Sequence, residues 1–115
     1  MITVYGIKNC DTIKKTLRWL DEQQQQATLH DYRKDGISSD LLNDMLSHFS
    51  PEDLVNRRGT TWRQLSDQEK ETALTNKGFK AVAAEHPALI KRPLIRLSND
   101  QWLLGYADLT SQASF

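Results

Sequence analysis

The stretch that decides the fold is residues 2–20, ITVYGIKNCDTIKKTLRWL. Residues 2–5 are apolar and rich in β-branched and aromatic side chains, which predicts a short buried strand that ends at Gly6. A loop then leads to Cys10. Residues 11–25 contain neither Gly nor Pro, and their apolar side chains recur at helical spacing, which predicts a helix. The order is therefore strand, loop, cysteine and helix.

Beyond this segment the pattern predicts three more strands and several helices. Residues 28–32 alternate and predict a second strand, while residues 94–97 and 101–104 predict a hairpin. Between the second strand and this hairpin, hydroxyl residues precede helix-forming stretches. The expected helix caps are Ser38 or Ser39, Ser50 and Ser66. Further short helices are expected over residues 79–85 and after Gly105.

This order of elements predicts an α/β fold with a mixed four-stranded sheet. A β-α-β unit implies two parallel strands, and the late hairpin adds an antiparallel pair. We expect a single domain over residues 1–115, in which a helical insertion of about residues 38–86 separates β-α-β from β-β-α.

Composition and charge narrow the class of protein. The chain has 115 residues, of which 38% are hydrophobic and 26% are charged, as is typical of one globular domain. Its 15 Lys and Arg residues balance 15 Asp and Glu residues, so no net field attracts nucleic acid or an anionic membrane. No apolar run approaches the ~20 residues of a membrane span, and the first residues lack a signal-peptide pattern. We expect a cytoplasmic monomer with no nucleic-acid or membrane partner.

Cys10 is the first candidate functional residue. It is the only cysteine, which excludes an intramolecular disulfide and a zinc site of several thiolates. Because it stands where the helix begins, its sulfur would face unpaired backbone N–H groups, which favour the thiolate and lower the pKa. Lys8 and Lys14 would add to this effect, and Asp11 would oppose it. The alternative is an inert cysteine that fills space, and the polar flanking residues argue against it.

A lone thiol needs a second thiol from outside the chain. A dithiol site would place another cysteine three residues after Cys10, where this chain has Ile13. A mixed disulfide at Cys10 would therefore be released by glutathione or a redoxin. The histidines are far apart in the sequence and form no nucleophile–base motif, and we expect no metal site. These histidines are His30, His48 and His86.

Arginines form the second candidate group. Arg57, Arg58 and Arg63 flank the segment GTTW of residues 59–62, and Arg92 immediately precedes Pro93. Guanidinium groups are flat, permanently charged and suited to oxyanions and carboxylates. The alternative for each arginine taken alone is solvated surface charge.

Three segments together resemble the arsenate reductase (ArsC) family: YGIKNC at residues 5–10, LVNRRGTTW at 54–62 and HPALIKRP at 86–93. The resemblance extends over essentially the whole chain, including the helical insertion. It implies a thioredoxin-like fold, with Cys10 as the redox nucleophile, Arg92 as an anion-holding residue beside the thiol, and Pro93 in the cis form. With it we expect no bound cofactor and glutathione as co-substrate. The residues expected to bind substrate or glutathione are Lys8, Asn9, Arg57, Arg58 and Pro93.

This chain departs from glutaredoxin-coupled arsenate reductases at three positions. Those proteins have a histidine where this chain has Gly6, and Gly105 replaces their third anion-binding arginine. Their second arginine is matched by either Arg57 or Arg58. Losing one guanidinium contact to a small oxyanion costs about 1.5–3 kcal/mol, or about ten- to a hundredfold in affinity.

The segment NRR at 56–58 and the ending LLGY at 103–106 are closer to the Spx-like branch of the family. Some members of that branch bind RNA polymerase and sense oxidants through a Cys-x-x-Cys pair, which Ile13 removes here. The first hypothesis is a glutathione-dependent monothiol reductase, with glutathione or glutaredoxin as partner and a small oxyanion or thiol-disulfide substrate. The alternatives are a non-catalytic Spx-like protein-binding regulator and a genuine arsenate reductase.

Overall fold

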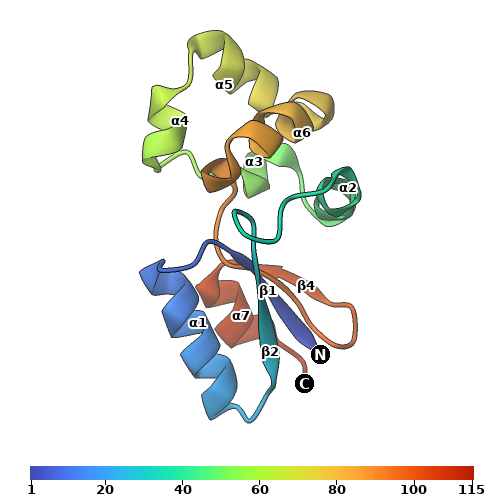
Figure 1. Ribbon diagram of the computed structural model, residues 1–115. Helices are drawn as coiled ribbons and strands as arrows, with labels where there is room; N and C mark the ends of the chain where they lie inside the picture. Colours follow the sequence, from blue (N-terminus) through green and yellow to red (C-terminus); the bar gives the residue numbers. More distant parts are fainter. The chain divides into compact units, whose positions relative to one another are not determined.

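In a computed structural model that describes residues 1–115, the chain divides into two compact units (Figure 1). We call Met1–Gly36 with Arg92–Phe115 the sheet unit, and Ile37–Lys91 the helical unit. None of the helices combines the length and hydropathy needed to span a lipid bilayer. The assignment of the whole chain to one domain stays a prediction.

The sheet unit is built on a mixed four-stranded sheet with the strand order β2-β1-β3-β4. β1 pairs in parallel with β2, whereas β3 is antiparallel to both β1 and β4, which confirms the predicted mixed sheet. The strands are β1 (Ile2–Gly6), β2 (Ala27–Asp31), β3 (Leu94–Arg96) and β4 (Trp102–Leu104), and the helices are α1 (Asp11–Glu22) and α7 (Tyr106–Gln112).

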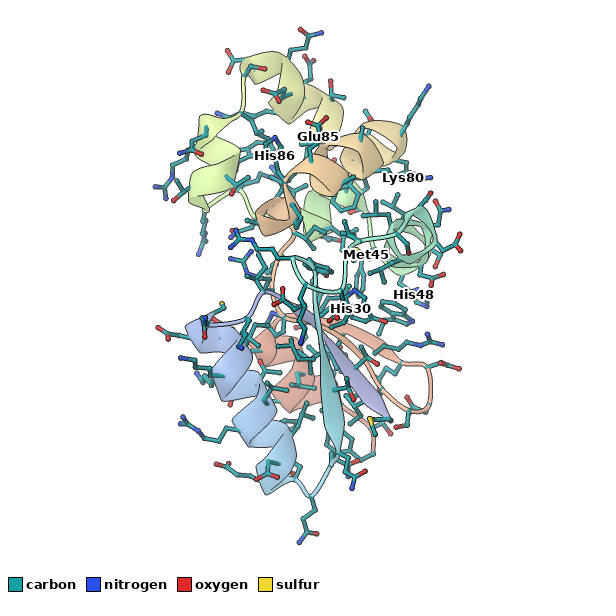
Figure 2. The ribbon with its side chains drawn as sticks, viewed as in Figure 1. His30, Met45, His48, Lys80, Glu85 and His86 are labelled. Atoms are coloured by element: carbon teal, nitrogen blue, oxygen red, sulfur yellow. The ribbon has the colours of Figure 1, made fainter.

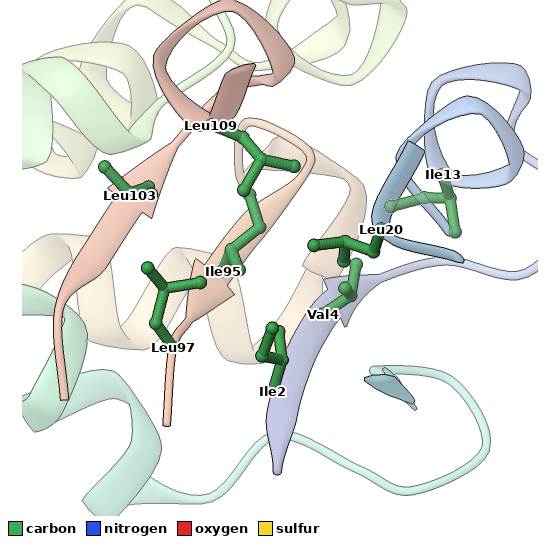
Figure 3. Close-up of a cluster of buried hydrophobic side chains, with 8 residues drawn as sticks. All are labelled: Ile2, Val4, Ile13, Leu20, Ile95, Leu97, Leu103 and Leu109. Carbon is green, nitrogen blue, oxygen red and sulfur yellow. The ribbon is translucent and has the colours of Figure 1, made fainter. Parts of the chain in front are cut away.

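One face of this sheet is covered by α1 and α7 through a shared apolar core (Figure 3). Its members are 4% exposed or less: Ile2, Val4, Ile13, Leu20, Ile95, Leu97, Leu103 and Leu109. Burying each such side chain contributes about 1.5–3 kcal/mol. Because α1 crosses between two parallel strands, this packing places its N-terminus at the carboxyl end of β1, where Cys10 lies.

Aromatic side chains gather on the opposite face of the sheet, because residues alternate along a strand and Tyr5 points away from the side of Val4. The Tyr5 ring stacks on Trp102 with centroids 5.8 Å apart and on Tyr32 at 6.5 Å. His30 lies 5.2 Å from the same ring. This aromatic cluster extends across the sheet from the edge strand β4 to the end of β2.

The helical unit consists of short helices: α2 (Ser39–His48), α3 (Pro51–Leu54), α4 (Thr60–Gln64), α5 (Asp67–Ala73), α6 (Asn76–Glu85) and a 3-10 turn at Pro87–Leu89. Side-chain oxygens cap four of them, and each accepts a backbone N–H at 3.1–3.2 Å. The capping residues are Ser38, Ser50, Ser66 and Thr75. At Ser66 the bond is reciprocated by Glu69, a complete capping box.

Several boundaries differ from the sequence-based expectation. α4 was not predicted, because it is only five residues long and its cap position, Gly59, has no side chain to signal a start. α1 ends at Glu22 instead of Gln25, since Gln24 adopts a left-handed φ of 59°. α6 begins three residues earlier than expected. Its Gly78 lies so close to the Thr72 carbonyl that a Cβ would overlap it.

Candidate active site

Cys10 is the N-cap residue of α1, as the sequence predicted. The preceding Asn9 has a left-handed φ of 69°, a conformation that asparagine tolerates better than most residues. Cys10 then returns to extended backbone, and its carbonyl accepts the first helical bond from Lys14 N–H at 3.1 Å. This turn places the sulfur at the start of the helix, half-buried.

The surroundings of Cys10 favour its thiolate form. The Cys10 side chain does not form a capping bond of the kind that the serines of the helical unit form, and its sulfur instead faces the backbone N–H groups of the first turn. Burial raises the pKa of the thiol, but the neighbouring backbone N–H groups of Ile13 and Thr12 favour the thiolate and lower it, and so does Arg92. The lowering effects prevail, so the pKa of Cys10 lies below its ordinary value.

Arg92 is the charged partner of this thiol. It acts on the Cys10 pKa through both a side-chain hydrogen bond and its positive charge. It lies where the chain re-enters the sheet unit, and its Cδ would be 3.8 Å from a Cβ built on Gly6. Lys8 and Lys14, the cations that the sequence placed near the thiol, are exposed.

The peptide bond between Arg92 and Pro93 is cis, as the resemblance implied. Pro93 is buried, and its carbonyl accepts a hydrogen bond from Gly105 N–H at 2.8 Å. Gly105 has φ 96° and ψ 152°, a region that is essentially restricted to glycine. An arginine at position 105, as in arsenate reductases, does not fit this backbone without strain.

Two further departures from relatives meet in space. A Cβ built on Gly6 would overlap Ile13 Cδ1 and would lie 3.0 Å from Ile13 Cγ1. Ile13 is 1% exposed, so it fills the space that a side chain at position 6 would need. Position 6, which lacks the histidine, and position 13, which lacks the second cysteine, therefore pack against each other beside Cys10.

The other predicted anion-binding arginines belong to the helical unit. Arg57 and Arg58 are exposed in the turn between α3 and α4. Asn56 Oδ1 accepts the Arg58 N–H at 3.2 Å, and Arg63 Nη2 donates to the Arg58 carbonyl at 2.7 Å. The structure therefore brings Cys10 and Arg92 together and leaves Arg57 and Arg58 in the other unit.

The three histidines lie on different elements, and each has a local neighbour (Figure 2). His30 Nε2 is 2.8 Å from the Gly36 carbonyl, and His48 Nδ1 is 3.0 Å from the Asp44 carbonyl. His86 Nε2 is 4.0 Å from the Glu85 carboxylate. None of these contacts is with Cys10, and no group of three potential metal ligands occurs in the structure.

Tyr32 is a feature that the sequence did not single out. It is 2% exposed, and its hydroxyl has no hydrogen-bond partner, which costs about 1–3 kcal/mol for a buried group. Its backbone N–H donates to the Gly6 carbonyl at 2.9 Å, at the edge of the sheet where Cys10 lies. Alternation in residues 28–32 predicts a strand residue here, and no sequence signal reveals an unsatisfied hydroxyl.

Comparison with curated proteins finds two informative relatives. An uncharacterized protein of Haemophilus influenzae is 47% identical over 115 residues, which are 100% of this chain and 99% of the relative. The global transcriptional regulator Spx 2 of Bacillus anthracis is 24% identical over 110 residues, which cover 94% of this chain and 82% of the regulator.

Solved structures show the same fold. A protein described as YffB is 33% identical with a TM-score of 0.85, and the alignment covers 98% of this chain and 100% of that one. An arsenate reductase (ArsC) related protein from Brucella melitensis is 32% identical with a TM-score of 0.76, with 96% and 92% covered. These matches confirm the thioredoxin-like α/β fold. Because the ArsC family profile also matches residues 5–113, the chain belongs to the ArsC family.

Proposed function

We propose that this protein is a glutathione-dependent thiol reductase in which Cys10 is the nucleophile. The observation that carries the proposal is the half-buried Cys10 at the start of α1, with its pKa lowered by two backbone N–H groups and by Arg92. A thiolate at neutral pH is the reactive form in disulfide exchange. Membership of the ArsC family and similarity to an arsenate reductase related protein support thiol chemistry.

The proposed cycle has two exchange steps. The Cys10 thiolate attacks the glutathione sulfur of a mixed disulfide, the S–S bond breaks, and the substrate leaves as a thiolate. Cys10 then carries glutathione. A second glutathione thiolate attacks this disulfide, which releases oxidised glutathione and restores the Cys10 thiolate. This cycle needs no second cysteine in the chain, which agrees with Ile13 at the position where a dithiol site would have one.

Arg92 has two roles in this proposal. It stabilises the thiolate before attack and holds an anionic group of the ligand afterwards. Lys8, Asn9 and Pro93 are the further proposed contacts to glutathione or substrate within the sheet unit, and Arg57 and Arg58 stay candidates from the sequence pattern alone. Glutaredoxin is the alternative reductant, and we propose a cytoplasmic monomer without a bound cofactor.

A second candidate is an Spx-like regulator that binds a protein and has no turnover. The similarity to Spx 2 of Bacillus anthracis favours it. Arsenate reduction is disfavoured because Gly6 is packed against Ile13 and Gly105 has a backbone that arginine does not fit. If the protein is such a regulator, we expect it to bind purified bacterial RNA polymerase, and we expect the Cys10→Ser variant to bind with the same affinity.

The deciding experiment is the reaction of the purified protein with oxidised glutathione. We expect mass spectrometry to show one added glutathione on Cys10. We also expect iodoacetamide alkylation to follow an apparent pKa clearly below the ~8.5 of a free cysteine. An alkylation midpoint at or above the free value overturns the proposal. Arsenate-dependent NADPH consumption in a glutathione and glutaredoxin assay would instead identify an arsenate reductase.

A further inference from the structure

The buried Tyr32 hydroxyl is the polar group that the proposed cycle leaves unused. The residue is 2% exposed, and its hydroxyl oxygen has no hydrogen-bond partner. More than nine in ten buried polar groups are satisfied, so an unsatisfied one in a folded protein needs an explanation. One explanation is that a ligand binds next to the hydroxyl and supplies the missing hydrogen-bond acceptor.

The position of Tyr32 points to the Cys10 edge of the sheet. Its N–H donates to the carbonyl of Gly6, the last residue of β1, at 2.9 Å. Gly6 is also the residue against which the Arg92 side chain lies, with 3.8 Å between Arg92 Cδ and a Cβ at that position. The Tyr32 ring is held by stacking on Tyr5, with centroids 6.5 Å apart. Tyr32 and Arg92 thus both adjoin the end of β1.

The charge state of Tyr32 suits a neutral donor. Burial and the neighbouring Tyr5 raise the pKa of the phenol, while the positive charge of Arg92 lowers it, and the net effect is a raised pKa. The hydroxyl therefore keeps its proton at neutral pH, where the Cys10 thiolate is proposed to react. It can donate a hydrogen bond to an anion without releasing a proton.

We infer that the Tyr32 hydroxyl donates a hydrogen bond to an oxygen of the anionic group that Arg92 binds beside Cys10. Tyr32 is then a ligand-binding residue of the site, and the ligand is an oxygen-bearing anion. This anion is either a carboxylate of glutathione or an inorganic oxyanion. The inference rests on the proposed function only for the first of these two sources.

Tyr5 supplies a matched control for the experiment. Its ring belongs to the same aromatic cluster, but its hydroxyl interacts with Arg96, which is paired with Asp100 outside the Cys10 site. Tyr32→Phe and Tyr5→Phe each remove one phenolic oxygen and keep the ring. Tyr32→Phe also removes an unsatisfied group, so we expect its stability to equal or exceed that of the wild type.

The test measures the rate at which Cys10 forms a mixed disulfide. With oxidised glutathione we expect Tyr32→Phe to be about tenfold slower than the wild type, which corresponds to about 1.4 kcal/mol, and Tyr5→Phe to be within about twofold. With cystamine, a disulfide that has no carboxylate, we expect all three proteins to be within about twofold.

A second arm measures how sulfate slows alkylation of Cys10 by iodoacetamide. Tenfold weaker protection in Tyr32→Phe would identify an inorganic oxyanion as the ligand.

The results separate this inference from the proposed function. Unchanged rates and unchanged sulfate protection in Tyr32→Phe overturn the inference, and so does an equal loss on both disulfides. If the wild type does not react with oxidised glutathione, the proposed function fails, and the sulfate arm still decides the role of Tyr32. Should Tyr32→Phe fail to fold, NMR of ring-labelled tyrosine in the wild type replaces it. A Tyr32 Cζ resonance that does not move on saturation with either anion overturns the inference.

Discussion

Most helices of the helical unit begin differently from the two helices of the sheet unit. In the helical unit, α2, α3, α5 and α6 each start at a Ser or Thr whose side-chain oxygen accepts a backbone N–H. In the sheet unit, α1 starts at Cys10 and α7 at Gly105, and neither makes a side-chain capping bond. A hydroxyl cap contributes about 1 kcal/mol to stability.

This difference shows that one position in a helix can serve stability or chemistry. A hydroxyl cap occupies the free N–H groups, as at Ser66. Cys10 leaves the same donors without a neutral acceptor, so that they stabilise negative charge when the thiol ionises. The sheet unit therefore gives up cap energy at the point where the reactive sulfur is needed. The four capped helices of the helical unit keep this energy, and α4 begins at Gly59 without a side-chain cap.

Replacing the cysteine with the ordinary cap residue is the most severe test of this comparison. In Cys10→Ser we expect complete loss of mixed-disulfide formation, because serine is not a nucleophile in this exchange. At pH 6 we expect the free energy of unfolding to stay equal or to rise by up to about 1 kcal/mol, since serine is a strong cap. Mass spectrometry and urea denaturation measure the two effects. A loss of more than about 1 kcal/mol would contradict the comparison.

The same pair of proteins predicts a pH dependence. The pKa of Cys10 is lower in the folded chain than in the unfolded one, so the thiolate stabilises the folded state above the unfolded pKa. This contribution is lost as the pH falls through the folded pKa. Wild-type stability relative to Cys10→Ser should therefore increase as the pH rises toward ~8.5. A difference that is constant between pH 5 and 9 would show that the thiol pKa is not lowered.

Gly6→His tests the packing that separates this chain from arsenate reductases. The new side chain must displace Ile13, and overpacking of this kind costs about 1–3 kcal/mol. Because the two side chains compete for one space, Gly6→His with Ile13→Ala should be less destabilised than the sum of the two single changes, by at least about 1 kcal/mol. Urea denaturation of the four proteins gives this coupling. If the losses of stability in the two single variants simply add in the double variant, the two side chains do not compete for one space.

Arg92→Lys asks whether the guanidinium supports the thiolate. Lysine keeps the charge but loses the planar arrangement of donors, so we expect a higher pKa for Cys10 and a reaction with oxidised glutathione that is several-fold slower at pH 7. The alkylation profile against pH measures the pKa. Arg96→Lys is the matched control, because that arginine is paired with Asp100 at 2.8 Å and lies outside the site. Equal alkylation profiles for both variants would show that the guanidinium of Arg92 does not support the thiolate.

The sequence predicts local features of this molecule better than features that arise from packing. The four strands, the caps at Ser50 and Ser66, and Cys10 at a helix start all follow from short-range patterns. The cis bond before Pro93 followed only from family resemblance. The contact of Gly6 with Ile13 and the unsatisfied hydroxyl of Tyr32 follow from neither, because they depend on which residues meet after folding.

The smallest expected effect comes from the helical unit, where two adjacent serines differ only in position. Ser38 is the N-cap of α2 and accepts the Leu41 N–H at 3.1 Å, whereas Ser39 is the first helical residue and is exposed. Ser38→Ala should lose about 0.5–1 kcal/mol, and Ser39→Ala should be neutral or slightly stabilising, because alanine has the higher helix propensity. Both variants should form the glutathione mixed disulfide at the wild-type rate. Equal stability of the two would mean that the caps of this unit contribute nothing, and the contrast with Cys10 would then reflect chemistry alone.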